Sequence, residues 1–294
     1  MNRYQFWYFY FCDGRSGLLV DFVKFVDKVY VRTALFSPER NVVFESEHLP
    51  ADAENFAGRQ GALPVRIGTA ELAEARSRGA AGQVTFEVKM EPGRTIVEYV
   101  PRFLSWLTGI PQLTSHLETS FTGVAEFGAE TLRYEKVPGV YTCYWMKDFA
   151  PWEWRFISAM DSDDDLFALE FVMSNYLGGW RASGYLRYAG AEYRAQGILD
   201  SLIKVQVLSP GVEENGRRNF ALSLKWGERS FLVEAQAPLD RFVILHSGYG
   251  GRVQTTLFGD CKVTAFASDG VGGRRKLGEG SAVGNCLLES KDRG

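Results

Sequence analysis

Short runs rich in apolar and β-favouring residues recur along most of the chain, and turn residues separate them. Tyr4–Phe11 and Leu18–Val26 flank a Gly-containing polar segment, Asp13–Gly17, which predicts a β-hairpin. Helical periodicity is scarce, with a short helix expected over Thr69–Arg78 and one or two turns between Pro101 and Pro111. This spacing of strands and turns favours antiparallel barrels or sandwiches. The other expected strands are Lys28–Leu35, Gln83–Met90, Arg94–Val100, Leu117–Phe127, Thr131–Lys136, Trp154–Ala159, Leu166–Ser174, Arg181–Tyr188, Leu202–Leu208, Phe220–Trp226, Phe231–Ala235, Arg241–His246, Val253–Phe258 and Cys261–Ala267.

An internal repeat indicates two similar halves. Trp7-Tyr8-Phe9, a turn and Leu19–Val23 open the chain, and Trp154-Arg155-Phe156, a turn and Ala168–Val172 restate the pattern. The tryptophan precedes a carboxylate by 14 residues in the first copy (Asp21) and by 16 in the second (Glu170). The pattern therefore predicts a structural duplication, with its boundary within residues 138–152.

Composition and charge limit the classes of binding partner that we expect for the chain. Aromatic residues make up 14% of the chain, which suits an apolar guest held in a ring-lined interior. The net charge of -3 gives no electrostatic reason to expect nucleic acid or an anionic membrane surface. No apolar run approaches the roughly 18 residues that a membrane span needs. Four scattered cysteines, no Asn-x-Ser/Thr site and no secretory signal favour reduced thiols and a cytoplasmic location.

The sequence contains no complete motif for a metal site, a nucleotide site or a serine hydrolase. Asp161–Asp165 is not a calcium loop, because Leu166 stands where glycine is needed and Val172 where a bidentate Glu belongs. The glycine clusters lack a strand–helix context, and there is no Gly-x-Ser-x-Gly elbow. The three histidines lie far apart in the sequence. We expect neither a metal nor a cofactor.

The segment Tyr141–Trp154 concentrates three tryptophans, two tyrosines, two carboxylates and a lysine. Burial among these rings would raise the pKa of Asp148 and keep it a proton donor near neutral pH. Lys147 opposes this by charge, but on a strand it points to the opposite face. The alternative is a Trp-rich plug that closes a barrel, with Asp148 and Glu153 solvated at its rim.

The same segment resembles the inter-domain signature of tandem lipocalin-like (calycin) proteins, through Tyr144–Asp148 and Ala150–Trp154. This family includes carotenoid 1,2-hydratase, tocopherol cyclase and lipocalin-like Diels–Alderases. Gln5–Phe9 is similar to the family's opening Glu-Trp-Trp-Tyr-Phe, and Gly259–Val263 with Leu288-Glu289 resembles its closing strands. The hydratases carry an Asp-His-Asn-Trp-Gly type of run, whereas Lys147–Ala150 lacks the His, Asn and Gly, which argues against hydration in particular.

Together, pattern and resemblance predict an all-β chain of two tandem antiparallel lipocalin-like barrels, residues 1–145 and 146–294. The expected function is a cofactor-independent cyclase or isomerase, for example a Diels–Alder pericyclase, acting on a small hydrophobic polyene or isoprenoid intermediate of natural-product biosynthesis. The alternatives are a non-catalytic carrier of a lipophilic ligand and a hydratase that adds water to an isoprenoid alkene. The expected catalytic residues are Asp148, Glu153 and Tyr144, and the expected substrate-binding residues are Trp7, Tyr8, Trp145, Trp152, Trp154 and His116.

Overall fold

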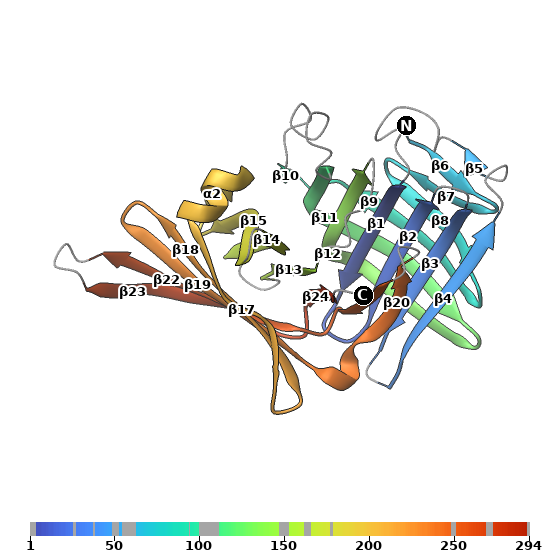
Figure 1. Cartoon of the computed structure of the whole chain (residues 1–294). Coiled ribbons are helices and arrows are strands. Elements are labelled where there is room, and N and C mark those ends of the chain that lie inside the picture. Colours follow the sequence, from blue (N-terminus) through green and yellow to red (C-terminus); the bar gives the residue numbers. More distant parts are fainter. Residues whose placement is uncertain are drawn as a thin grey trace. The chain divides into compact units, whose positions relative to one another are not determined.

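The computed structural model of the chain forms two compact units, Met1–Ala150 and Pro151–Gly294 (Figure 1). The boundary lies between residues 150 and 151, whereas the sequence places it between 145 and 146. The structure describes residues 4–25, 28–37, 39–48, 53–54, 63–93, 95–99, 112–146, 153–161, 166–176, 179–247, 251–268 and 273–292.

Unit 1 is built from one 12-stranded antiparallel sheet, drawn in blue to green in Figure 1. Its strands are β1 (Tyr4–Cys12), β2 (Gly17–Phe25), β3 (Lys28–Phe36), β4 (Asn41–His48), β5 (Ala53–Glu54), β6 (Val65–Ile67), β7 (Ala70–Ala73), β8 (Arg76–Ala81), β9 (Val84–Glu91), β10 (Thr95–Glu98), β11 (Gln112–Phe127) and β12 (Glu130–Met146). They follow the order β4-β3-β2-β1-β12-β11-β9-β8-β7-β6-β5, with β10 paired to β11. The expected β1–β2 hairpin is confirmed.

This sheet curls until β4 approaches the β8–β9 hairpin, so that unit 1 is a near-closed barrel. The backbone N–H of Gly82 in that hairpin donates to Ser46 Oγ of β4 at 2.8 Å. A Cβ at Gly82 would lie 2.7 Å from the Phe44 ring, and its φ of +57° favours glycine as well. Gly82 therefore allows the two edges of the barrel to meet.

The expected helix over Thr69–Arg78 is wrong, because this segment forms β7, a tight turn and the start of β8. Ala70 and Leu72 point to the core while Glu71 between them faces outward, which is the period of a strand. Pairing with β6 and β8 overrides the local helix preference of this Ala- and Glu-rich stretch.

An aromatic cluster fills the interior of unit 1. Phe11 lies 4.7 Å from both Phe121 and Tyr134, and Phe9 lies 5.5 Å from Phe121, measured between ring centroids. Trp7, on the same face of β1, is 1% exposed. Alternation along β1 thus places every second ring inside the barrel.

Unit 2 forms two antiparallel sheets, drawn in yellow-green to red in Figure 1. Its strands are β13 (Trp154–Met160), β14 (Phe167–Tyr176), β15 (Gly179–Tyr188), β16 (Ala191–Ala195), β17 (Val205–Glu214), β18 (Arg217–Trp226), β19 (Arg229–Pro238), β20 (Val243–Ser247), β21 (Gly251–Thr256), β22 (Asp260–Ser268), β23 (Arg274–Ala282) and β24 (Cys286–Lys291). The 7-stranded sheet has the order β16-β15-β14-β13-β24-β21-β20, and the 5-stranded sheet has the order β17-β18-β19-β22-β23. Phe171 from one sheet and Phe220 from the other belong to one shared core. The all-β prediction is confirmed, but the described residues of unit 2 do not close into a second barrel.

The two units repeat one topology. The first strand of each lies between its second and its last strand: β1 pairs with β2 and β12, and β13 pairs with β14 and β24. Trp7 and Trp154 therefore lie on equivalent strands, as the repeat predicts. They differ, however, in which way they face relative to the core of their own unit. Trp7 points into the core of unit 1. On β13 the inward residues are Ile157 and every second residue from it, such as Ala159, so Trp154 points outward.

The two carboxylates of the repeat, Asp21 and Glu170, correspond more closely in structure than its two tryptophans do. Asp21 pairs across the ladder with Tyr8, and Glu170 pairs with Ser158, in both cases on the outward face of the sheet. Both carboxylates are buried. Four residues separate the last paired residues of the first hairpin, Cys12 and Gly17, and seven separate those of the second, Met160 and Ala168. This odd difference puts Trp154 out of phase with Trp7.

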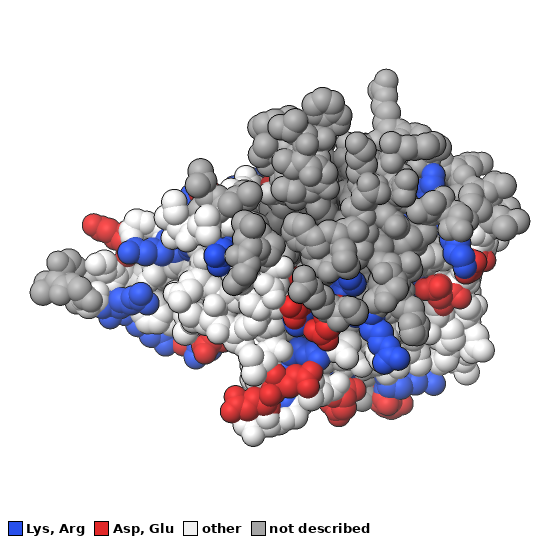
Figure 2. All heavy atoms as spheres, viewed as in Figure 1, with Lys and Arg blue, Asp and Glu red and all other residues white. Residues whose placement is uncertain are grey.

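Helix is limited to α2 (Gly197–Ile203) and the 3-10 turn η2 (Leu239–Arg241) in the described residues. α2 takes the first two residues of the run Leu202–Leu208 that was expected to be a strand. Within the described part of the chain, the helices are too short to cross a membrane. In the view of Figure 2, basic and acidic side chains are interspersed over the residues drawn in colour.

Candidate functional site

Six of the expected site residues lie, in sequence, at the end of β12, at the start of β13 or between the two strands. Asp148 and Trp152 fall outside the described residues. Tyr144 and Trp145 lie at the end of β12, where their backbones pair with Phe6 and Gln5 of β1.

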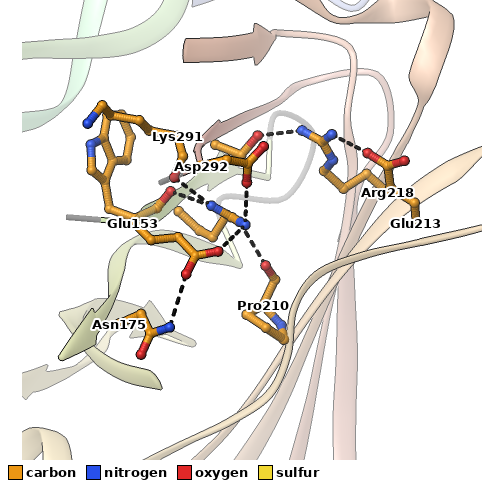
Figure 3. Close-up of polar contacts among 10 residues, drawn as sticks. Glu153, Asn175, Pro210, Glu213, Arg218, Lys291 and Asp292 are labelled. Atoms are coloured by element: carbon orange, nitrogen blue, oxygen red, sulfur yellow. Dashed lines mark hydrogen bonds and ion pairs between the residues drawn. The ribbon is translucent and has the colours of Figure 1, made fainter. Parts of the chain in front are cut away.

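Glu153 and Trp154 begin unit 2, and Glu153 is held by two side chains. Glu153 Oε1 accepts a hydrogen bond from Arg155 Nη2 at 3.1 Å, and Oε2 accepts one from Asn175 Nδ2 at 3.0 Å (Figure 3). Trp154 contributes its backbone carbonyl to Arg155 Nη1 at 3.0 Å.

Arg155 ties the two sheets of unit 2 together. From β13 it donates through Nε to the carbonyl of Pro210 on β17 at 2.9 Å. It also donates to the carbonyl of Lys291 and to Asp292 Oδ1, each at 2.8 Å. Its guanidinium carbon lies 5.0 Å from the Trp180 ring centroid. This pattern of satisfied donors is that of a structural anchor, and Glu153 belongs to it.

A second arginine repeats the arrangement from the opposite sheet. Arg218 on β18 bonds to Ser290 of β24 and to Glu213 of β17 (Figure 3). Its guanidinium carbon lies 4.9 Å from the Phe242 ring centroid. Both arginines thus occupy one end of the inter-sheet space of unit 2, where a ligand would have to displace them.

Tyr8 and Trp7 lie on opposite faces of β1. Tyr8 stacks with Tyr10, with ring centroids 6.2 Å apart, and lies 6.0 Å from Phe6. Trp7 belongs to the interior of the barrel. The structure therefore does not bring these two expected binding residues together, but it does bring Trp7 and His116 to one face.

That face carries several polar residues of the interior of unit 1. Strands β1, β12 and β11 lie side by side, and two rows of paired residues cross them on the inward side. Thr114, His116 and Tyr141 are half-buried rather than enclosed. Solvent therefore reaches part of the inner face at this end of the described strands, which we call the open end. The rows are Trp7–Cys143–Thr114 and Phe9–Tyr141–His116.

We call Thr114, His116, Tyr141 and Cys143 the polar cluster. Tyr141 Oη and Cys143 Sγ are hydrogen-bonded at 3.2 Å. The ring centroids of His116 and Tyr141 are 5.5 Å apart. An imidazole, a phenol and a thiol thus gather at the edge of an aromatic interior.

Burial keeps these groups uncharged. It lowers the pKa of His116 below its ordinary value, so the imidazole is neutral near pH 7. Burial, the Cys143 thiol and the Glu74 carboxylate raise the pKa of Tyr141 well above its ordinary value. Burial likewise raises the pKa of Cys143 to about 12. The polar cluster therefore offers a neutral base beside two protonated weak acids.

Sequence reasoning selected His116 and Trp7 but missed Tyr141, Cys143 and Thr114. The alternation of Tyr141 and Cys143 along one strand could have placed both on a single face. The pairing of β11 with β12, which adds Thr114 and His116, has no local signal.

Neither the surface hollow of unit 1 nor the metal-ligating side-chain types offer a second candidate site among the described residues. A surface hollow beside the β11–β12 hairpin is lined by Glu39, Arg40, Phe127 and residues 128–130, and Arg40 already covers the Phe127 ring and pairs with Glu130. Among the described residues, no group of three or more His, Cys, Asp and Glu side chains could hold a metal ion.

No family model matches the sequence, and comparison with curated proteins found no match. Solved structures do match. A protein from Nitrosomonas europaea, described as a putative AttH, superposes with a TM-score of 0.63 at 15% identity, covering 98% of this chain and 92% of that one. Kievitone hydratase from Nectria haematococca gives a TM-score of 0.63 at 9% identity, covering 100% of this chain and 89% of that one. At these identities the likeness shows the fold, and at that level it confirms the resemblance to tandem lipocalin-like proteins.

Proposed function

We propose that the chain is an enzyme that binds a small hydrophobic substrate at the open end of unit 1 and adds water to a carbon–carbon double bond. The observation that carries the proposal is the polar cluster, in which a neutral imidazole and a protonated phenol stand on a half-exposed inner face above an aromatic interior. The fold shared with a hydratase supports it. This reverses the order of the hypotheses drawn from sequence, where cyclisation came first.

The reaction needs one base and one acid. Neutral His116 would take a proton from water as the new C–O bond forms, because its lowered pKa keeps the nitrogen lone pair free. Tyr141 would donate a hydrogen bond to an oxygen of the substrate or to the attacking water. For the acid that protonates the other alkene carbon, the proposal keeps Asp148, whose role rests on the sequence alone. The π bond and one O–H bond of water break, and one C–H and one C–O bond form. Transfer of a proton from His116 back to Asp148 through solvent restores both groups.

A cyclase or isomerase is the second candidate, because hydrogen-bond donors on the same face could polarise a carbonyl while aromatic rings fold the substrate. A carrier would use the same surface without turnover. The three differ in the product: a hydratase adds one water, a cyclase gives an isomer of unchanged mass, and a carrier returns its ligand.

The test is incubation with kievitone, and separately with isoprenoid alkenes, in ¹⁸O-labelled water, followed by mass spectrometry. Hydration predicts a product heavier by one labelled water. Replacing His116→Gln should lower the rate by roughly 10²–10⁴-fold. The matched control is His246→Gln, a histidine on β20 of unit 2, which should leave the rate unchanged. An isomer of unlabelled mass would support the cyclase, and an unchanged rate in His116→Gln would contradict the proposal.

A further inference from the structure

Gln5 is a buried polar residue at the open end of unit 1. It shares the inward face of β1 with Trp7 and Phe9, and its backbone pairs with Lys24 and Trp145. The side chain is only 6% exposed. Its carboxamide oxygen is buried and, within the part of the chain that the structure describes, accepts no hydrogen bond.

Thr114 of the polar cluster shows the same condition. Its hydroxyl oxygen is buried and makes no hydrogen bond to the described residues. Thr114 lies on the same inward face, in the row that contains Trp7 and Cys143. A buried polar group without a partner is rare in native proteins, because its lost hydration is not compensated. Two of them at the edge of one half-exposed face indicate that a ligand supplies the partners.

The chemistry of that ligand follows from the two groups. A carboxamide offers an acceptor oxygen and a donor nitrogen, and a threonine hydroxyl both donates and accepts. A ligand hydroxyl satisfies each of them in either orientation, whereas a carboxylate cannot donate to an oxygen. The neighbouring His116, Tyr141 and Cys143 are uncharged near neutral pH.

We infer that Gln5 and Thr114 are substrate-binding residues that recognise hydroxyl groups, so that the substrate is an uncharged hydrophobic alcohol or phenol. This inference rests on the proposed function for the location of the site, and it adds the substrate class. It also explains why a residue that destabilises the empty barrel is present at position 5: a ligand hydroxyl would compensate the buried carboxamide.

A pair of probes that differ by one hydroxyl tests the inference. Binding of 2-naphthol and of naphthalene to the full chain is measured by equilibrium dialysis, for the wild type and for Gln5→Met, which keeps the length of the side chain. We expect Gln5→Met to weaken 2-naphthol binding by roughly three- to tenfold, the worth of one hydrogen bond. Naphthalene binding should not change, and the melting temperature should stay the same or rise.

Thr33→Val is the matched control. Thr33 is another buried hydroxyl without a partner among the described residues, but it is fully enclosed on the inner face of β3. It should affect neither probe. Unchanged 2-naphthol binding in Gln5→Met, or an equal loss of both probes, would overturn the inference and leave the proposed function standing. If the wild type binds neither probe, the site at the open end of unit 1 and the inference both fail.

Discussion

Replacing Arg155→Met tests whether the polar contacts at the end of unit 2 are a structural anchor. The Arg155 side chain is 8% exposed, and its three nitrogens donate to three backbone carbonyls and two carboxylates. Met keeps most of the volume and removes every one of these donors. The carbonyls of Pro210 and Lys291 then lose partners in a site that water does not easily reach.

The expected loss of folding stability in Arg155→Met depends on which contacts of Arg155 are buried. Asp292 is 66% exposed, so its pair with Arg155 is screened by solvent and contributes little. The cost comes from the buried carbonyls and from Glu153, which is mostly buried. Removing one partner from such a buried charged group costs about 3–5 kcal/mol. That is a large share of the roughly 5–15 kcal/mol by which folded proteins are stable.

The assay is chemical denaturation of the full chain, combined with hydrogen exchange read on peptides from β13 and β17. Arg155→Met should unfold at lower denaturant concentration and lose protection first in these two strands. Arg194→Met is the control, because Arg194 is 41% exposed and its pair with Glu192 lies at the surface, so the change should stay within about 0.5 kcal/mol. Wild-type stability and protection in Arg155→Met would refute the anchor.

Three further predictions concern unit 1 and the junction. The buried ion pair between Asp21 and Arg32 contributes little net stability, because burial raises the pKa of Asp21 despite the nearby guanidinium. Asp21→Asn alone leaves the Arg32 charge buried without its partner and should cost about 3–5 kcal/mol of stability, measured by urea denaturation. Replacing Asp21 with Leu and Arg32 with Met together should cost almost none. Equal losses in both would contradict this. Because the pKa of folded His116 lies below the ordinary 6.5, its contribution to stability is complete above that pH and is lost as the pH falls through the lowered value. The wild type should thus lose more stability than His116→Gln between about pH 7 and about pH 5, and parallel curves would refute the burial of the imidazole. Asp148→Asn should lower turnover by roughly 10²–10⁴-fold at an unchanged melting temperature, and full turnover would exclude Asp148 as the acid.

The sequence predicted the strands better than their partners. The aromatic run Tyr4–Phe11 and the Gly-containing turn after it correctly predicted β1 and its hairpin with β2, because that signal is local. The helix expected over Thr69–Arg78 is wrong because this stretch of good helix formers pairs instead with the strands next to it in the sequence, β6 and β8. The opposite faces of Trp7 and Trp154 depend on a register that spacing alone does not specify.

The candidate site shows the same limit. His116 and Tyr141 are 25 residues apart in the sequence and become neighbours only through the pairing of β11 with β12. Glu153 stood out as a carboxylate in an aromatic segment, but its partner Asn175 lies on the strand paired with β13. Composition alone indicates an aromatic interior. The polar cluster at its edge, in contrast, forms only because of the register in which β11 pairs with β12.

Nuclear magnetic resonance of the histidines most directly tests the claim that the inner face of unit 1 binds the substrate. The chain has three histidines, so selective labelling of the imidazoles gives three resonances, and the one missing in His116→Gln identifies His116. We predict that saturating 2-naphthol shifts the His116 resonance. If the His116 resonance does not move while 2-naphthol is bound, the substrate site lies elsewhere and the account is contradicted.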